Sequence, residues 1–465
     1  MGSIIGARSR GQGLLAALLL LTTTGTLAQE QGRLGDMADR FDQARLASSD
    51  LRTVRRAGLE IFATPFNFGD GYGDGPMDPS DPLSSGGRPT LGNNGTFLRI
   101  NGLDGQSCVD CHALVSTSTV PPRFGVGGFG GINDVPILKP TVMDIIDVSE
   151  AGFAFTDGRI IVPPHLFGSG AVQLLAEEMT AELQRLRDLS LSQPGRVVPL
   201  RTHGVDFGSV IADGAGNIDL DGVTGVDRDL VVRPFGRKGE FATVRDFAAN
   251  AMAFHFGMEP VELVGPDVDG DGDGVANELL VGEISALEIF LTTMERPAKK
   301  AQGNVREGAR VFFEIGCAEC HRPLLESKGR QLSYRLPDAD TPHYTTNLTA
   351  PPAGFEPRGT GIAVRLYSDL KRHDMGPELA ESFGEATNAR NREFVTPRLW
   401  GVGDSAPYLH DGRALTLTEA IEWHGGEGED ARNAFVAARN GERAALVAFL
   451  KSLRLPQQPN LDVVR

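Results

Sequence analysis

The stretch Cys317–His321 reads CAECH, and an earlier stretch, Cys108–His112, reads CVDCH. Two thiols one turn apart can add to the two vinyl groups of one porphyrin, and the adjacent histidine can then ligate the iron. C-x-x-C-H is therefore typical of a c-type haem attachment site. The two stretches predict two covalently bound haem c groups, with four thioether anchors and two proximal iron ligands: Cys108, Cys111, Cys317, Cys320, His112 and His321.

Other sites share the C-x-x-C core, namely zinc sites, redox-active dithiols and pairs of disulfides. Zinc ribbons usually place their two pairs roughly 15 to 20 residues apart, whereas about two hundred residues separate the pairs here. A histidine also follows each pair directly, which favours haem. Because the two motifs use all four cysteines, we expect no disulfide.

The N-terminus has the order of a secretory signal. Arg8 and Arg10 precede an apolar run from Leu14 to Leu21, and small residues follow up to Ala28. A membrane span would need roughly 20 apolar residues, and no later segment is long enough. We therefore expect residues 1–28 to be a signal peptide cleaved near Ala28, with no membrane span and a periplasmic mature protein.

The charge of the chain limits its partners. Its 61 acidic and 45 basic residues give a formal net charge of -16, which argues against nucleic acid as a ligand. An acidic surface would suit a basic redox partner, although surplus acid also serves solubility.

Helical periodicity frames the haem motifs. Residues 304–315 carry one apolar stripe before Cys317, residues 446–453 carry another near the end of the chain, and residues 51–62 precede the first motif. A first and a last helix that cross beside the haem form the cytochrome c arrangement. The stretch 197–232 is instead rich in Gly, Asp and Val, which favours short strands and turns.

These patterns predict a mainly α protein with two cytochrome c-like haem domains. The first would span residues 29–298, with a small β/loop-rich insertion at about 195–240 and a calcium loop at 267–278. The second would span residues 299–465.

The calcium loop is predicted by a complete twelve-residue frame, D-x-D-x-D-G followed by a closing glutamate. Carboxylates would come from Asp267, Asp269 and Asp271, a backbone carbonyl from Asp273, and two oxygens from Glu278. The alternative is a solvated acidic turn, since no clear helix precedes the loop. Four aspartates this close repel one another unless a cation holds them.

His424 is the strongest candidate for a second axial ligand. Leu417, Ala420, Ile421 and His424 fall at helical spacing, and Thr416 and Glu419 match a capping box, so the histidine should point inward. A hydrogen-bonded core histidine is the alternative. We expect His373 and His410 to hydrogen-bond within the haem pocket.

Several segments resemble one family: TPRLW at 396–400, APYLHDG at 406–412, TLTEAI at 416–421, HDMG at 373–376 and WHGG at 423–426. The chain is similar to the bacterial di-haem cytochrome c peroxidases and methylamine dehydrogenase maturases, and more closely to their di-haem oxidoreductase branch. The resemblance is strongest from Gly316 onward. In the relatives the position of His424 holds the sixth ligand of the C-terminal haem, a Met or a Tyr. The resemblance therefore implies a bis-histidine haem here, with a lower potential than a His/Met pair.

The resemblance also implies an acid–base residue beside the N-terminal haem. The segments 140–142, 156–159 and 178–179 match the relatives' series in order, which makes Glu178 the matching carboxylate. A carboxylate near an open ferric haem can move the proton that peroxide cleavage requires. Alternatively, Glu177 and Glu178 are surface charges on a helix.

Two features depart from the relatives. Thr156 stands where they have a tryptophan, and no histidine occurs between residues 113 and 159 to serve as a displaceable ligand. His165 and His255 are weak candidates for a ligand to the N-terminal haem iron. Each can equally be a packed histidine.

The combined prediction is a periplasmic di-haem c oxidoreductase of the cytochrome c peroxidase type. One haem would reduce hydrogen peroxide, and the other would relay electrons from a small redox protein, a cytochrome or a copper protein. The alternatives are a non-enzymatic electron-transfer cytochrome and haem-dependent oxidation of a protein or organic substrate. The residues do not name the donor, the physiological substrate, the catalytic haem or the oligomeric state.

Overall fold

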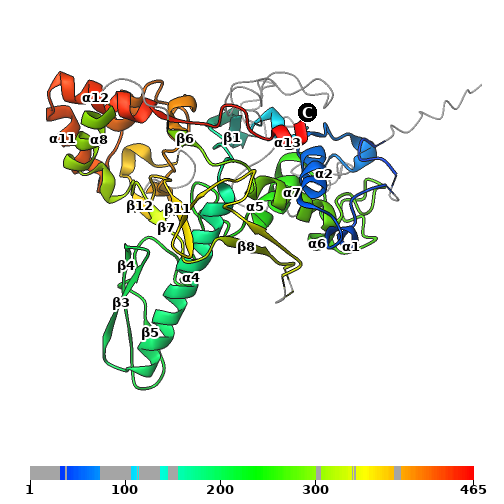
Figure 1. Ribbon diagram of the computed structural model, residues 1–465, viewed down its shortest axis with the longest axis horizontal. Helices are drawn as coiled ribbons and strands as arrows, with labels where there is room; N and C mark the ends of the chain where they lie inside the picture. The colour runs from blue at the N-terminus through cyan, green and yellow to red at the C-terminus, as the bar shows by residue number, and fades with distance from the viewer. Residues whose placement is uncertain are drawn as a thin grey trace, which may run out of the picture.

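The computed structural model describes residues 32–36, 39–73, 106–112, 114, 137–144, 155–299, 305–337, 339, 342–381 and 389–464, and for 137–144 and 155–161 only the backbone. The expected signal peptide lies outside these residues. The described part contains more helix than strand, with short paired strands between the helices (Figure 1).

The N-terminal unit is built on two crossing helices, α2 (Leu51–Ala63) and α7 (Val281–Thr292). Asp50 caps α2 by accepting a hydrogen bond from the backbone N–H of Thr53 (2.8 Å). The helices meet at Gly58, where a Cβ would collide with the carbonyl oxygen of Ala286. Only glycine allows this close approach.

The C-terminal unit repeats the arrangement with α8 (Val305–Glu314) and α12 (Asn440–Lys451). Here Gly308 faces the carbonyl oxygen of Ala445, and a Cβ at Gly308 would collide with it. Phe449 closes the contact from α12, as Phe290 does from α7 in the N-terminal unit.

A long arm leaves the body between the two units (Figure 1). It consists of the helix α4 (Ser169–Ser192) and an antiparallel sheet of β3 (Val197–Thr202), β4 (Val205–Ala212) and β5 (Ile218–Asp219). Every second residue of β3 is buried, which turns one face of the sheet toward α4. The segment expected to form short strands is therefore this arm.

The remaining strands form small sheets. They are β1 (Ile137–Asp144) with β2 (Phe155–Ile161), β7 (Leu325–Glu326) with β10 (Glu356–Arg358) and β11 (Gly361–Val364), β8 (Gln331–Tyr334) with β9 (Tyr344–Asn347), β12 (Arg372–Asp374) with β13 (Glu393–Val395), and β6 (Ala298–Lys299) with β14 (Leu453–Arg454).

Short helices complete the chain. The α-helices are α1 (Gln43–Leu46), α5 (Val244–Ala251), α6 (Val261–Val264), α9 (Ala389–Arg392), α10 (Leu417–Glu422), α11 (Glu429–Ala437) and α13 (Leu461–Val464). A π-helical turn, Met252–Phe256, extends α5, and 3-10 turns lie at η1 (Phe68–Asp70), η2 (Cys108–Asp110), η6 (Cys317–Glu319), η7 (Pro377–Leu379), η8 (Val402–Asp404) and η9 (Gly426–Gly428).

Two hydrophobic cores hold the body together. The larger core fills the N-terminal unit and the base of the arm. It continues into residues 325–370 and Trp400, and it includes Leu455, Val463 and Val464 from the end of the chain. The smaller core joins α8, α10, α11 and α12. After α12 the chain thus runs back to the N-terminal unit, where α13 packs beside α2 (Figure 1). Within the described residues no helix has the length and apolar character of a membrane span.

Candidate haem sites

The first C-x-x-C-H motif begins in the 3-10 turn η2 and leaves His112 partly buried. The backbone N–H of His112 donates to the carbonyl of Cys108 (2.9 Å), and its ring Nδ1 donates to the carbonyl of Pro164 (3.0 Å). Burial lowers the pKa of His112 to about 4, so the ring is neutral at physiological pH. This leaves Nε2 as the nitrogen that can ligate a metal.

The second motif repeats this geometry around η6. The backbone N–H of His321 donates to the carbonyl of Cys317 (3.0 Å), and its Nδ1 donates to the carbonyl of Tyr367 (3.1 Å). Burial lowers the pKa of His321 to about 4 and raises that of the Cys317 thiol to about 12. In both motif histidines Nδ1 therefore sets the orientation of the ring, and Nε2 is the nitrogen that can ligate a metal.

His424 lies opposite His321, just after the end of α10. The capping box is present, because the Thr416 hydroxyl accepts from the Glu419 N–H (3.2 Å) and the Glu419 carboxylate accepts from the Thr416 N–H (2.9 Å). His424 Nδ1 donates to the carbonyl of Ala420 (2.8 Å), and burial lowers its pKa. The His321 and His424 ring centres are 6.4 Å apart.

This separation tests whether one haem iron fits between the two rings. Two metal–nitrogen bonds of about 2 Å, plus about 1 Å from each nitrogen to its ring centre, give roughly 6 Å. The observed spacing therefore suits an iron held by His321 on one face and His424 on the other.

The two weak ligand candidates of the N-terminal haem are placed differently. His165 is buried, and its Nε2 donates to the carbonyl of Trp400 (2.7 Å). His165 also directly follows Pro164, whose carbonyl accepts the hydrogen bond from His112 Nδ1. His255, in the π-helical turn after α5, lies close enough to His112 for its charge to oppose protonation of that ring.

Glu178 lies on α4 at the base of the arm. Its carboxylate accepts hydrogen bonds from His203 Nε2 (2.9 Å) and from the backbone N–H groups of Lys328 (2.8 Å) and Gly329 (2.8 Å). Burial alone would raise the pKa of this carboxyl, but the three donors outweigh it and the pKa is lowered. Glu178 therefore links the arm to the C-terminal unit as a carboxylate ion.

The predicted calcium loop contains two overlapping acidic clusters. Ligand atoms of Asp269, Asp271 and Asp273 lie within 4.8 Å of one another, as do those of Asp271, Glu278 and Glu259. Gly272 has φ +75°, as the sharp turn of the frame requires. Asp267 stands in neither cluster, because its Oδ1 accepts from Asn277 Nδ2 (2.8 Å).

Glu259 is a site residue that the sequence pattern did not indicate. It precedes the twelve-residue frame, and its carboxylate accepts from the Gly270 N–H (2.6 Å) inside the loop. Glu259, Asp271 and Glu278 are 7%, 5% and 1% exposed. Three carboxylates this buried and this close suit a cation, because their mutual repulsion needs compensation.

Beside the second motif, His373 is held between two carboxylates. Its Nε2 lies 2.8 Å from Asp369 Oδ2 and its Nδ1 lies 2.7 Å from Glu427 Oε2, while Cys320 Sγ is 3.9 Å away. His410 stacks on Phe394, with ring centres 4.6 Å apart. Burial lowers the pKa of His410 to about 4.

A second buried polar group lies in the N-terminal unit. Arg245 on α5 contacts Glu262, Ser285 Oγ (2.9 Å) and Glu288 Oε2 (3.5 Å). Burial raises the pKa of Glu288 to about 8, against the opposing effect of Arg245. No sequence signal separates Glu288 from the apolar helix around it, because one acidic residue within a hydrophobic run carries no motif.

Comparison with known proteins gives one family match and one curated relative. A family described as "Di-haem oxidoreductase, putative peroxidase" matches residues 264–453, which include the second motif and His424 but not the first motif. A cytochrome-c peroxidase of Denitromonas iodatirespirans is 25% identical over 154 residues, covering 32% of this chain and 39% of that protein. The chain thus matches about two fifths of the length of this curated relative.

Two solved structures are also similar in part. One is a MauG-like protein associated with microbial copper homeostasis, with 15% identity, coverage of 62% of this chain and 89% of that chain, and a TM-score of 0.28. The other is hydrazine synthase of Kuenenia stuttgartiensis, with 18% identity, coverage of 44% and 60%, and a TM-score of 0.25. Residues 264–453 of this chain are therefore similar to the di-haem oxidoreductases.

Proposed function

We propose that the chain is a periplasmic di-haem c oxidoreductase that reduces hydrogen peroxide. The observation that carries this proposal is the shared geometry of His112 and His321. Each is partly buried, is oriented through Nδ1 by a backbone carbonyl, and keeps Nε2 for iron. When bound, the two haems supply irons that change oxidation state by one electron. The family match and the cytochrome-c peroxidase relative support the coarser assignment.

The proposed haem domains are residues 29–298 and 299–465, each with a haem beside its own helix crossing. The pairs α2–α7 and α8–α12 support this division, because both cross at a glycine that faces an alanine carbonyl. Residues 1–28 would direct the chain across the inner membrane, where haem c is attached.

The axial ligands of the two haems would decide which haem relays electrons and which reduces peroxide. His321 and His424 together would fill both axial positions of the C-terminal iron, which suits electron relay from a cytochrome or copper protein. Peroxide would then be reduced at the haem held by His112. His255, near His112, is the candidate for a ligand that must leave before peroxide enters.

Glu178 is the proposed proton-transfer residue, and its hydrogen bonds also join α4 to the C-terminal unit. The variant Glu178→Gln distinguishes the catalytic role from the structural role. Lower peroxide turnover with unchanged haem content and unfolding midpoint would support proton transfer at the carboxylate. An unchanged rate would remove Glu178 from the chemistry.

A calcium ion is proposed at the two acidic clusters that share Asp271, with Glu259 added to the ligands of the sequence frame. Chelation should lower the unfolding midpoint of the haem-loaded protein, and added Ca²⁺ should restore it. The matched variant Glu259→Gln should weaken the response, while Asp267→Asn should leave it nearly intact. A chelator-insensitive midpoint would count against the ion.

The second candidate function is non-enzymatic electron transfer. It is favoured by the His321–His424 pair and by the position of His255, which together could leave both irons six-coordinate. Low-temperature electron paramagnetic resonance of the oxidised and half-reduced protein distinguishes the two functions. A high-spin ferric signal in either state supports the peroxidase, whereas two low-spin signals that persist after half-reduction support the carrier.

A further inference from the structure

The carbonyls that orient the two motif histidines are joined by a continuous series of bonds. On the N-terminal side, His112 Nδ1 donates to the carbonyl of Pro164, and the next residue is His165. On the C-terminal side, His321 Nδ1 donates to the carbonyl of Tyr367, and the preceding residue is Leu366. The series therefore needs only a link between His165 and Leu366.

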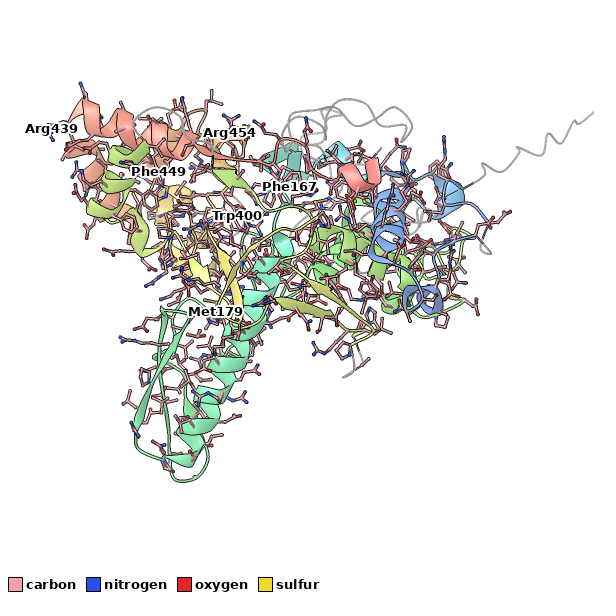
Figure 2. The ribbon with its side chains drawn as sticks, viewed as in Figure 1. Phe167, Met179, Trp400, Arg439, Phe449 and Arg454 are labelled. Atoms are coloured by element: carbon pink, nitrogen blue, oxygen red, sulfur yellow. The ribbon has the colours of Figure 1, made fainter. Side chains whose placement is uncertain are left out.

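Leu399 and Trp400 supply that link. The ring of His165 donates from Nε2 to the carbonyl of Trp400 (2.7 Å), and the backbone N–H of Leu399 donates to the carbonyl of Leu366 (3.1 Å). Four hydrogen bonds and the covalent segments between them thus join His112 to His321. Figure 2 shows Trp400 in the middle of the body, between Phe449 of the C-terminal unit and the helices of the N-terminal unit.

The tautomer of His165 follows from its surroundings. Its Nε2 lies 2.7 Å from the Trp400 carbonyl oxygen. A carbonyl oxygen can only accept, so the proton sits on Nε2 and points at Trp400. The ring is 6% exposed and stacks against Phe167 with 30° between the planes. His165 is therefore held in the orientation that the link requires.

We infer that this series, which we name the proximal bridge (Pro164, His165, Leu366, Tyr367, Leu399 and Trp400), carries single electrons between the two proposed haems. Electronic coupling falls less steeply through covalent and hydrogen bonds than through space. One electron leaves the ferrous haem at His321 and arrives at the ferric haem at His112. The first is oxidised and the second is reduced, and no bond breaks. The inference rests on the proposed two-haem function.

His165 is the one member that contributes its side chain, so it can be tested by substitution. His165→Phe keeps an aromatic ring but removes the donor, whereas His165→Gln keeps an amide N–H that can reach the Trp400 carbonyl. Trp400→Phe is the matched control, because the bridge uses the carbonyl of Trp400 and not its indole. The indole is the rival route, since it is itself buried in the same place.

The experiment adds one electron to the fully oxidised haem-loaded protein by pulse radiolysis and follows its redistribution between the haems by absorbance. The redistribution is a first-order phase independent of protein concentration. We expect the rate constant of electron redistribution to be about tenfold or more lower in His165→Phe than in the wild type. It should be near the wild-type value in His165→Gln and unchanged in Trp400→Phe. The two reduction potentials, measured by spectroelectrochemical titration, should stay as in the wild type.

Three results would overturn the bridge. The first is an unchanged rate constant of electron redistribution in His165→Phe. The second is an equal decrease of this rate constant in Trp400→Phe. The third is a decrease in His165→Phe that a shift in the reduction potentials fully explains. Steady-state peroxide turnover is recorded separately. A protein that redistributes electrons through His165 but turns over no peroxide would refute the proposed peroxidase and leave the bridge standing.

Discussion

At the scale of single residues, the proposed pair of haem ligands His321 and His424 is open to direct test. His424→Met would replace the imidazole by a thioether, and His/Met haems have higher potentials than bis-histidine haems. We expect the potential of this haem to rise by on the order of 0.1 V, because axial ligands span about 0.8 V in all. Spectroelectrochemical titration measures it. His203→Gln, on the arm, is the control, and a potential unmoved by His424→Met would show that His424 is not a ligand.

Glu288 predicts a pH dependence of stability. Its pKa is raised to about 8 in the folded protein, from an ordinary value of 4.5. Between these values the folded state holds more protons than the unfolded state, so the free energy of unfolding should fall as pH rises. The contribution is present below about pH 4.5 and lost above about pH 8.

Glu288→Gln should flatten this fall, because glutamine has no proton to lose. Urea unfolding of the haem-loaded protein at several pH values between 5 and 8 measures the slope of the unfolding free energy against pH. A shift of one pKa unit corresponds to about 1.4 kcal/mol of unfolding free energy. The Glu288 carboxyl faces Arg245 on α5, Glu177 on α4 and Tyr334 on β8. Equal slopes in wild type and variant would mean that these neighbours, and not Glu288, titrate.

The residues that sequence could indicate are those whose partners lie nearby in the chain. The motif histidines, the inward orientation of His424 and the turn at Gly272 all follow from local spacing. Glu259 and the proximal bridge could not be predicted, because they depend on how distant segments meet. A backbone carbonyl such as that of Trp400 leaves no residue-type signal at all.

At the scale of elements, the two helix crossings set the position of each haem motif. In the C-terminal unit α8 ends just before η6, so the α8–α12 crossing positions His321. The apolar stripes at 304–315 and 446–453 predicted these helices. The small sheets from β7 to β13 were not predicted, because strands of two to four residues carry too little alternation to separate them from loop.

Gly308→Ala should weaken the α8–α12 crossing. The added methyl group would meet the carbonyl of Ala445, and such overpacking costs about 1 to 3 kcal/mol. Gly441→Ala on α12 is the matched control, because no atom lies within 4 Å of its added Cβ and the substitution should stabilise by about 0.5 kcal/mol. Denaturant unfolding, followed by the haem absorbance, compares the unfolding free energies of the two variants. Similar stability in both variants would mean that the helices can separate at no cost.

At the scale of the whole molecule, the end of the chain ties the two units together. After α12 in the C-terminal unit, Asn460 Nδ2 donates to the carbonyl of Leu114 (2.8 Å), and Leu455, Val463 and Val464 enter the larger core. The units therefore share a core, and neither can open fully without disturbing this contact. Sequence periodicity could not predict it, because four helical residues give no periodic signal.

The ion pair between Arg55 on α2 and Asp462 on α13 is one contact of this connection that a single substitution can remove. Arg55 is fully buried on α2, and its Nε lies 2.8 Å from the Asp462 carboxylate on α13, which is one-third exposed. Asp462→Asn would remove the carboxylate that pairs directly with this buried guanidinium. Partial exposure of the carboxylate reduces the cost to about 2 kcal/mol of unfolding free energy, below that of a fully buried pair.

Equilibrium urea unfolding of the haem-loaded protein measures this loss, with Glu60→Gln as the control. Glu60 pairs with the neighbouring Arg56 on the same helix but is exposed, so its loss should change stability by less than about 0.5 kcal/mol. If Asp462→Asn behaved like Glu60→Gln, the hydrogen bonds of Arg55 to Thr293 (2.7 Å) and Asn460 (3.0 Å) would suffice for its charge. The apolar contacts of Val463 and Val464, with the hydrogen bonds from Arg52 and Arg56 to the backbone of α13, would then hold α13 against the N-terminal unit.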